Sequence, residues 1–265
     1  MAPRVTGNSG QNLALRAIGS FASHIVTASK GVSNLIVPQL CAACGIEIGP
    51  DSDELCGSCW MELSALVAVP HCNGCGDDAR PYLLIDGQCT RCRFKRRPFD
   101  VFIRVGRYTG ALRSLVLRFK RHFILDRLLG RLLRDALAGK LELSDIDHWV
   151  PIPSHWRRRL WRGFQPTSLL TRAAIPKGAG TAESLLTMTR YVPPFHHKMS
   201  SRDRSKAIAG AFRMARGTVV RGGTVLIIDD VSTTGATLRE AARVVRAAGA
   251  SRVVVAVIAR SVWGA

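Results

Sequence analysis

Apolar residues follow two different periods in the second half of the chain, and stretches with the two periods alternate. Short apolar runs predict strands, and apolar positions three and four apart predict amphipathic helices. Strands that alternate with helices predict an α/β fold, with a mostly parallel sheet flanked by helices. The predicted strands are VFIRVGRY at 101–108, a run near 148–152, the run that begins at Val225, and RVVVAVIAR at 252–260, with a further short apolar run, SLLTM, at 184–188. The predicted helices carry Leu112, Leu115, Val116 and Phe119, and then cover 124–139, 166–174 and 237–249.

The first 37 residues carry a weaker pattern. Five apolar residues there can form one helical stripe, which Gly, Ser and Thr interrupt: Leu13, Leu15, Ile18, Phe21 and Ile25. We therefore expect a tail, helical in part, over residues 1–37. The tail has no compact apolar core before a small-residue cleavage site, so we expect no secretory signal peptide. No apolar run approaches the length of a membrane span.

All eight cysteines lie between residues 41 and 92, in four Cys-x-x-Cys pairs. One such knuckle presents two thiolates to a tetrahedral ion, and a second knuckle completes the shell. The spacing predicts a small zinc-binding module over residues 38–97. We expect the cysteines to bind metal in a reducing cytoplasm and not to form a disulfide framework. The spacing leaves open whether one or two zinc ions bind and which pairs share an ion, and it fits an iron–sulfur cluster less well. The predicted metal ligands are Cys41, Cys44, Cys56, Cys59, Cys72, Cys75, Cys89 and Cys92.

The run VLIIDDVSTTGATL, residues 225–238, combines an apolar strand, two carboxylates and a loop of small residues that opens a helix. Asp229 and Asp230, at the end of the strand, can accept hydrogen bonds from the two vicinal hydroxyls of a ribose. The loop brings backbone N–H groups and hydroxyls around a phosphate, and the helix points its positive end at the anion. The predicted 5′-phosphate-binding residues are Ser232, Thr233, Thr234, Gly235, Ala236 and Thr237.

A second candidate anion site lies in VPIPSHWRRRLWRGF, residues 150–164. Prolines stiffen a loop that leaves a predicted strand, and several guanidinium groups follow, which suits pyrophosphate. By itself the segment fits equally well a solvated basic helix, or a surface on which Trp156 and Trp161 stack the bases of single-stranded nucleic acid. The predicted pyrophosphate-binding residues are Pro151, Ile152, Pro153, Arg157 and Arg158.

The chain has 38 Lys and Arg against 19 Asp and Glu, a formal net charge of +19. This balance favours a polyanionic partner, and nucleic acid is the first choice. A compositional enrichment in Arg would give the same charge with no partner. Arg-rich runs that contain aromatic residues, at 93–97 and 157–162, are where we expect single-stranded DNA to bind.

The ordered set of apolar strand, acidic pair and TTGAT loop resembles the PRPP-binding signature of type I phosphoribosyltransferases. The order of motifs over residues 40–260, from the Cys-x-x-Cys pairs through VPIPSHWRR and RGF to IIDDVSTTGAT, resembles the ComF family of bacterial competence proteins. This resemblance implies a zinc-knuckle module joined to a type I phosphoribosyltransferase-like domain, here residues 98–265. It implies PRPP–Mg²⁺ or a phosphoribosyl nucleotide as ligand, with Asp229 and Asp230 as the catalytic pair, and Lys120 matches a lysine of the family. It also implies a link to DNA uptake, with a competence helicase or other DNA-processing proteins as partners.

The resemblance leaves two functions open. If active, the protein transfers the phosphoribosyl group of PRPP to a nitrogen acceptor and releases pyrophosphate. The alternative is a non-catalytic protein that senses PRPP or a nucleotide, or that binds single-stranded DNA. The chain departs from the family at Gln165-Pro166, where the family has Asn-Gln, and in the polar loop at Pro193, His196 and Ala207. Because these departures concern substrate recognition, the sequence names no acceptor.

Overall fold

The computed structural model describes residues 39–49, 54–192 and 200–261. The predicted N-terminal tail and the loop residues Pro193 and His196 lie outside these ranges. The chain divides into two compact units, Met1–Gly57 and Ser58–Ala265. Within the described ranges, no helix combines the length and the apolarity that crossing a membrane requires.

The described part of the first unit is a tight cysteine knuckle. An antiparallel bridge joins Leu40 to Glu47. The Cys41 N–H donates to Ile46 O at 2.8 Å, and the Gly45 N–H donates to Cys41 O at 2.9 Å. Gly45 has a φ of 81°, a left-handed conformation that a residue with a Cβ adopts only at a cost. Glycine at this position therefore lets the chain reverse directly after Cys44.

Helix α2 (Gly57–Val67) leads into a second cysteine knuckle. The Glu62 carboxylate on α2 accepts a hydrogen bond from the Ala111 N–H at 3.1 Å, which fixes α2 to the first turn of helix α4. A two-residue turn with positive φ at Asp86 (51°) and Gly87 (71°) closes the hairpin of the knuckle. The short elements of this region are η1 (Pro81–Leu83), β1 (Leu84–Ile85), β2 (Gln88–Cys89) and α3 (Thr90–Arg93).

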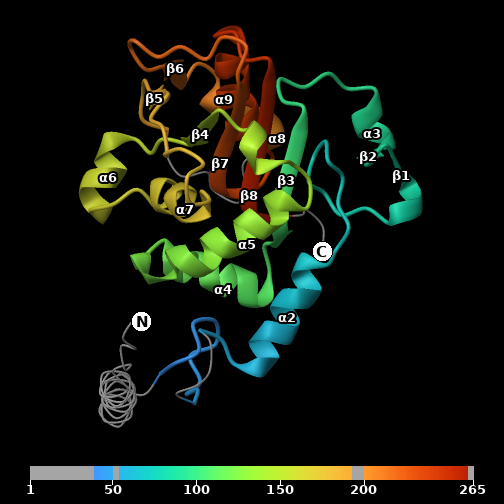
Figure 1. Ribbon diagram of the computed structural model, residues 1–265, viewed down its shortest axis with the longest axis vertical. Helices are drawn as coiled ribbons and strands as arrows, with labels where there is room; N and C mark the ends of the chain where they lie inside the picture. The colour runs from blue at the N-terminus through green and yellow to red at the C-terminus, as the bar shows by residue number, and fades with distance from the viewer. Residues whose placement is uncertain (1–38, 50–53, 193–199, 262–265) are drawn as a thin grey trace, which may run out of the picture. The chain divides into compact units, whose positions relative to one another are not determined.

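The core of the second unit is a four-stranded parallel sheet with the order β3-β8-β7-β4 (Figure 1). Its central strands are buried along most of their length, as their near-continuous Val, Ile, Leu and Ala runs require. The predicted parallel α/β sheet is thus confirmed. The strands are β3 (Val101–Arg107), β4 (His148–Pro151), β7 (Thr224–Ser232) and β8 (Arg252–Arg260).

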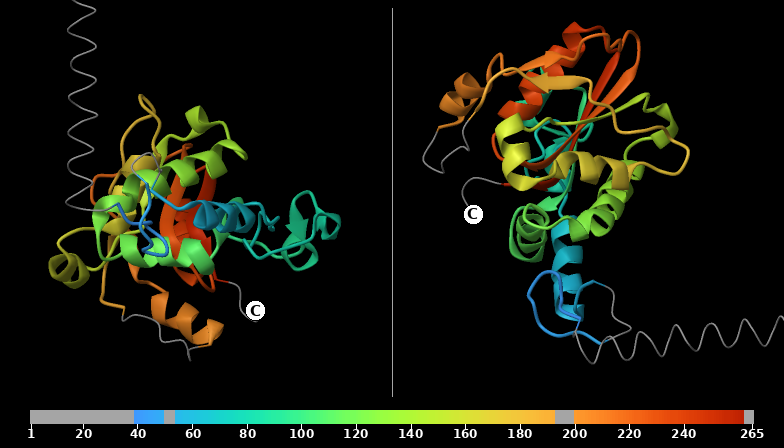
Figure 2. Two further views of the ribbon diagram at one scale, coloured as in Figure 1. Left: turned by 90° about the horizontal axis from the view of Figure 1, so that it is seen from below. Right: turned by 90° about the vertical axis from the view of Figure 1, so that its left-hand side faces the viewer.

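Helices cover both faces of this sheet, which Figure 2 shows from two further directions. Helix α9 (Ala236–Ala247) shares a buried cluster with Val225 and Ile227 of β7. Because side chains alternate along a strand, the intervening residues of β7 face the other layer, where α5 (Asp126–Ala138) and α7 (Pro166–Ala174) pack together. The remaining elements are α4 (Gly110–Phe119), α6 (Trp156–Arg162), α8 (Ser201–Ile208), the antiparallel pair β5 (Leu186–Met188) and β6 (Phe212–Met214), and the 3₁₀ turns η2 (Phe123–Leu125) and η3 (Leu143–Asp145).

Candidate functional site

A pocket of ≈ 370 Å³ opens at the carboxyl ends of β4 and β7. Its lining brings Asp229, Asp230 and all residues of the loop 232–237 together with Lys120, which follows α4. Ile152 and its neighbours after β4 form the facing wall. The ribose and phosphate residues predicted from the sequence therefore lie in one cavity, at the edge of the sheet where ligands of parallel α/β folds bind.

The acidic pair belongs to a charged network inside this pocket. Lys120 Nζ lies 3.1 Å from Asp230 Oδ1, and the Asp230 N–H donates to Asp229 Oδ1 at 2.9 Å. Burial, and then repulsion from Asp230, raise the pKa of the Asp229 carboxyl to about 7. Burial alone would lower the pKa of Lys120, but attraction to Asp230 and Asp229 raises it. Asp229 therefore keeps its proton to a higher pH than an exposed carboxyl, and Lys120 stays charged at neutral pH.

The loop between β7 and α9 has the geometry of an anion site. Gly235 has a φ of 72° and directly precedes Ala236, the first residue of α9. A Cβ at Gly235 would lie 3.1 Å from a guanidinium nitrogen of Arg239, so the position excludes a side chain by space as well as by backbone conformation. The first turn of a helix leaves N–H groups without intrahelical partners. These N–H groups and the positive end of α9 together suit a phosphate.

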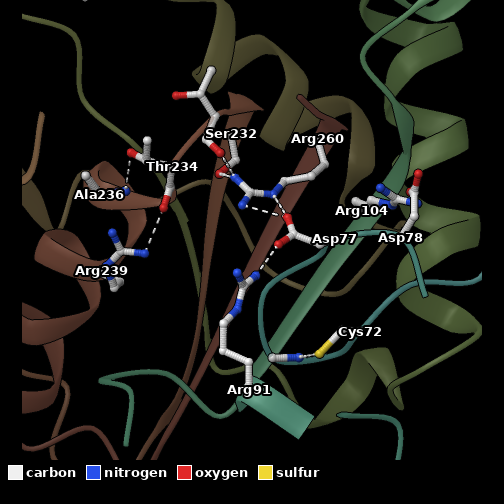
Figure 3. A network of polar contacts seen from close by, with 12 residues as sticks. Cys72, Asp77, Asp78, Arg91, Arg104, Ser232, Thr234, Ala236, Arg239 and Arg260 are labelled. Carbon is white, nitrogen blue, oxygen red and sulfur yellow. Dashed lines mark hydrogen bonds and ion pairs between the residues drawn. The ribbon is translucent and has the colours of Figure 1, made fainter. Parts of the chain in front are cut away.

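Three arginines from three different elements hold the loop in place, and Figure 3 shows two of them, Arg239 and Arg260. They lie on α8, on α9 and at the end of β8, and each donates to an atom of the loop. The pairs are Arg204 to Thr233 Oγ1 (3.0 Å), Arg239 to Thr234 O (2.8 Å), and Arg260 to Ser232 Oγ (3.1 Å) and to Thr233 O. The phosphate loop is therefore fixed through its carbonyl and hydroxyl oxygens, and inside the loop the Ala236 N–H donates to Thr234 Oγ1 at 3.4 Å.

The eight cysteines are thiols that form two groups of four, each with its sulfur atoms within 4.8 Å of one another. Each group has the composition and the spread of a structural zinc site with four cysteine ligands. In the second group, the N–H groups of Gly74 and Cys89 donate to Cys72 Sγ at 3.3 and 3.1 Å, which favours the thiolate form of Cys72. A thiolate is the form that binds metal, so this group fits zinc. The groups are Cys41, Cys44, Cys56 and Cys59, and Cys72, Cys75, Cys89 and Cys92.

Comparison with known proteins gives a domain family for each of two parts of the chain. Residues 189–261 match the family model of the phosphoribosyl transferase domain, and residues 32–93 match that of the double zinc ribbon domain. The DNA utilization protein YhgH of Salmonella typhimurium is 32% identical over 237 residues, which is 86% of this chain and 99% of the relative. The chain belongs to the ComF family. Competence protein F of Haemophilus influenzae is 27% identical over 84% of this chain and 95% of its own length, and the YhgH protein of Escherichia coli K12 is 29% identical over 86% and 99%.

In this member of the ComF family, the second cysteine knuckle is linked to the phosphate loop through an aspartate that pairs with Arg260. Asp77 Oδ1 accepts from Arg260 Nε at 3.0 Å and lies 2.9 Å from the adjacent guanidinium nitrogen of Arg260. The other oxygen, Asp77 Oδ2, lies 2.6 Å from Arg91. The next residue, Asp78, pairs with Arg104 and, at 2.5 Å, with Arg107 on β3. Two consecutive carboxylates of the ribbon therefore compensate two buried arginines of the sheet, Arg104 and Arg260.

The predicted pyrophosphate loop lies partly along the pocket. Ile152 and Pro153 line it, and Pro151 ends β4 beside the acidic strand. The Arg157 guanidinium instead stacks over the Trp156 ring, 5.5 Å from its centroid. The Arg158 side chain lies outside the described part of the structure. Arg162, farther along α6, does line the pocket.

Gln165, the residue that departs from the family pattern, supports this loop. Gln165 Nε2 donates to Ile152 O at 3.3 Å, and Thr167 Oγ1 donates to the same oxygen at 2.7 Å. His155 is buried, and its Nδ1 accepts from the Arg157 N–H at 3.3 Å. The loop after β4 therefore has its own backbone anchors, which the proline pattern did not identify.

Proposed function

We propose that the pocket at the end of β7 binds PRPP–Mg²⁺ or a related phosphoribosyl ligand. The observation that carries this proposal is the meeting of Asp229 and Asp230 with the phosphate loop 232–237 and Lys120 in one cavity. Asp229 and Asp230 accept hydrogen bonds from the ribose hydroxyls, and the loop N–H groups bind the 5′-phosphate. Mg²⁺ binds mainly through substrate oxygens and waters, which is its habit in phosphate sites.

The catalytic form of this proposal is a phosphoribosyl transfer. The bond between the anomeric carbon and pyrophosphate breaks, its electron pair leaves with pyrophosphate, and a nitrogen acceptor supplies the pair for the new bond. Positive charge develops on the ribose, and the two carboxylates stabilise it, so no side chain has to attack covalently. The predicted pyrophosphate residues are Pro151, Ile152, Pro153, Arg157 and Arg158, and the pocket adds Arg162 and Lys120 as cations that suit the leaving group.

Calorimetric titration with PRPP and Mg²⁺ tests the proposal. Asp229→Asn combined with Asp230→Asn should abolish binding, while the melting temperature stays close to that of the parent. Asp145→Asn is the matched control, because Asp145 is exposed in η3 and does not line the pocket. If the double variant binds PRPP as the parent does, the site is not a phosphoribosyl site.

We propose single-stranded DNA binding as a second function, in a reducing cytoplasm and together with DNA-processing proteins. It is favoured by two exposed aromatic rings that each lie beside a guanidinium. Phe94 is 83% exposed with Arg93 5.8 Å from its ring centroid, and Trp156 is 56% exposed with Arg157 at 5.5 Å. Such pairs can stack unpaired bases and contact phosphates. The names of the relatives, which refer to DNA utilization and competence, support the same function.

A salt series with single-stranded and double-stranded DNA tests this second function. If phosphates are contacted, the logarithm of the binding constant should fall with the logarithm of the salt concentration, with a slope of about −0.7 for each phosphate neutralised on a single strand. Phe94→Ala and Trp156→Ala should each weaken single-strand binding by about 1–3 kcal/mol. Leu160→Ala, which removes an exposed apolar side chain from the same helix as Trp156, should have no such effect. Binding that ignores both aromatic rings would be unspecific electrostatics.

A further inference from the structure

A second cavity, of ≈ 1120 Å³, adjoins the phosphate loop. It shares Thr233, Thr234 and Gly235 with the phosphoribosyl pocket, but its other walls differ. They come from the second cysteine knuckle, from the basic segment at 95–97, and from the first residues of α8. This cavity therefore lies beside the phosphoribosyl pocket and shares part of its phosphate loop.

The lining of this cavity is strongly cationic. Among the lining residues that the structure describes, Asp77 alone is acidic, and it already bridges Arg91 and Arg260. Arg239 shows the excess charge directly, because burial first, and then repulsion from Arg260 and Arg97, lower the pKa of its guanidinium. The cationic lining residues are Arg91, Lys95, Arg96, Arg97, Arg202, Arg239 and Arg260.

Of these cations, Arg91 and Arg260 pair with Asp77, whereas Arg239 donates to the Thr234 carbonyl. Figure 3 shows the guanidinium groups of Arg91, Arg239 and Arg260 converging from three elements. Arg239 and Arg260 each use part of the guanidinium to hold a carbonyl of the phosphate loop, at Thr234 and Thr233. Guanidinium groups bind phosphate oxygens through paired N–H donors, and a concave basic surface raises the local concentration of anions.

We propose that this cavity is a second anion-binding site, which takes several consecutive phosphate groups of one ligand beside the phosphoribosyl pocket. The cavity is too large for one phosphate, and its cations are spread along three walls, which suits a chain of phosphates. Such a chain has two sources, a free condensed phosphate or the backbone of a nucleic-acid strand. The site does not depend on PRPP binding in the neighbouring pocket.

Calorimetric titration of the zinc-loaded full chain with inorganic tripolyphosphate is the primary test. Arg96→Gln combined with Arg97→Gln removes two cations of the cavity and should weaken tripolyphosphate binding by at least about tenfold. Binding of PRPP–Mg²⁺ by this variant should stay within about twofold of the parent, since neither residue lines the phosphoribosyl pocket. Arg213→Gln combined with Arg216→Gln is the matched control, because it removes the same charge from exposed positions outside the cavity.

Competition experiments distinguish the phosphoribosyl pocket from the second cavity, and they distinguish a free condensed phosphate from a nucleic-acid backbone. Saturating PRPP–Mg²⁺ should leave tripolyphosphate binding in place. The second competitor is an oligothymidylate of about 12 nucleotides. If it competes with tripolyphosphate, and if Arg96→Gln combined with Arg97→Gln weakens its binding, the source is a strand backbone. An oligothymidylate that does not compete identifies a free phosphate chain.

Three results would overturn the proposal: unchanged tripolyphosphate affinity in the cavity variant, an equal loss in the control variant, or complete displacement by PRPP. A parent protein that binds tripolyphosphate in this cavity but never binds PRPP would refute the proposed function and leave the second anion site standing.

Discussion

Replacing Asp77 by Asn should weaken PRPP binding although Asp77 lies outside the phosphoribosyl pocket. Asp77 holds Arg260 through contacts of 3.0 and 2.9 Å, and Arg260 in turn holds Ser232 Oγ and Thr233 O. Asparagine keeps the shape of the side chain but removes its charge and one acceptor oxygen. Arg260 then loses the group that fixes its direction, and the phosphate loop loses a rigid anchor.

The exposed fractions of the side chains set the size of the effect on stability. Arg260 is 8% exposed, so its charge-assisted bonds to Asp77 are worth about 1.5–3 kcal/mol. Arg91, the other partner of Asp77, is 73% exposed, and its pair adds at most about 1 kcal/mol. We therefore expect the free energy of unfolding to fall by about 2–3 kcal/mol. The Kd for PRPP should rise about tenfold, which corresponds to about 1.4 kcal/mol of loop reorganisation.

Asp78→Asn is the control for this reasoning. It is the neighbouring carboxylate, and it pairs with Arg104, whose side chain is fully buried. Leaving that buried guanidinium without its counter-charge should cost about 3–5 kcal/mol, at least as much as the change at Asp77. None of the contacts that the structure gives Arg104 reaches the phosphate loop. Stability should therefore fall in both variants, but the PRPP affinity only in Asp77→Asn.

Chemical denaturation and PRPP calorimetry, carried out on both variants below their melting temperatures, separate the outcomes. Equal losses of PRPP affinity would mean that general destabilisation explains the effect. Unchanged PRPP affinity in Asp77→Asn would mean that Arg260 does not position the loop.

Two further predictions concern the metal groups and pH. Metal analysis should find two zinc ions per chain, one for each cysteine group. Chelation should unfold both knuckles and, because Asp77 then no longer orients Arg260, weaken PRPP binding. A chelated protein with unchanged thermal stability would contradict this prediction. The pKa of Asp229 is raised from 3.8 to about 7 in the folded chain, so the free energy of unfolding should fall as the pH rises from about 4 to about 7, where only the folded chain still holds this proton. Because ribose hydroxyls donate to the ionised carboxylate, PRPP affinity should rise as the pH passes through about 7. Calorimetry at several pH values should show this rise in the parent and a flatter curve in Asp229→Asn.

Periodicity was enough to predict the sheet and most of its helices. Strands β7 and β8 are buried on both faces, so their apolar runs are uninterrupted, and α7 begins and ends at the predicted Pro166 and Ala174. The closeness of the acidic pair to the phosphate loop could also be predicted, because both belong to a single strand–loop–helix unit of the sequence. Spacing could not decide which cysteine pairs share an ion, since this depends on how each knuckle folds back on the next.

The arginine contacts were beyond the reach of sequence patterns because they depend on tertiary structure. Ser232 and Arg260 become neighbours only through the register of two parallel strands. Asp77 and Arg260 are 183 residues apart, and neither belongs to a motif. Pyrophosphate binding by Arg157 stays a prediction, and the contact of its guanidinium with the Trp156 ring, 5.5 Å from the centroid, depends on side-chain packing that a sequence pattern does not show.

The second ribbon is best understood as part of the phosphate site and not as a separate appendage. Arg104 and Arg260 are buried in the sheet, and a buried guanidinium without a counter-charge is strongly destabilising. Their carboxylates, Asp78 and Asp77, come from the turn directly after Cys75, so their positions depend on the fold of a knuckle that zinc stabilises. A fragment of residues 98–265 would leave both arginines without these carboxylates, and Arg260 would hold the phosphate loop without the contact that orients it. The joining of the ribbon and the phosphoribosyltransferase-like domain in one chain therefore has a physical reason: the turn after Cys75 supplies the carboxylates that compensate Arg104 and Arg260 of the sheet.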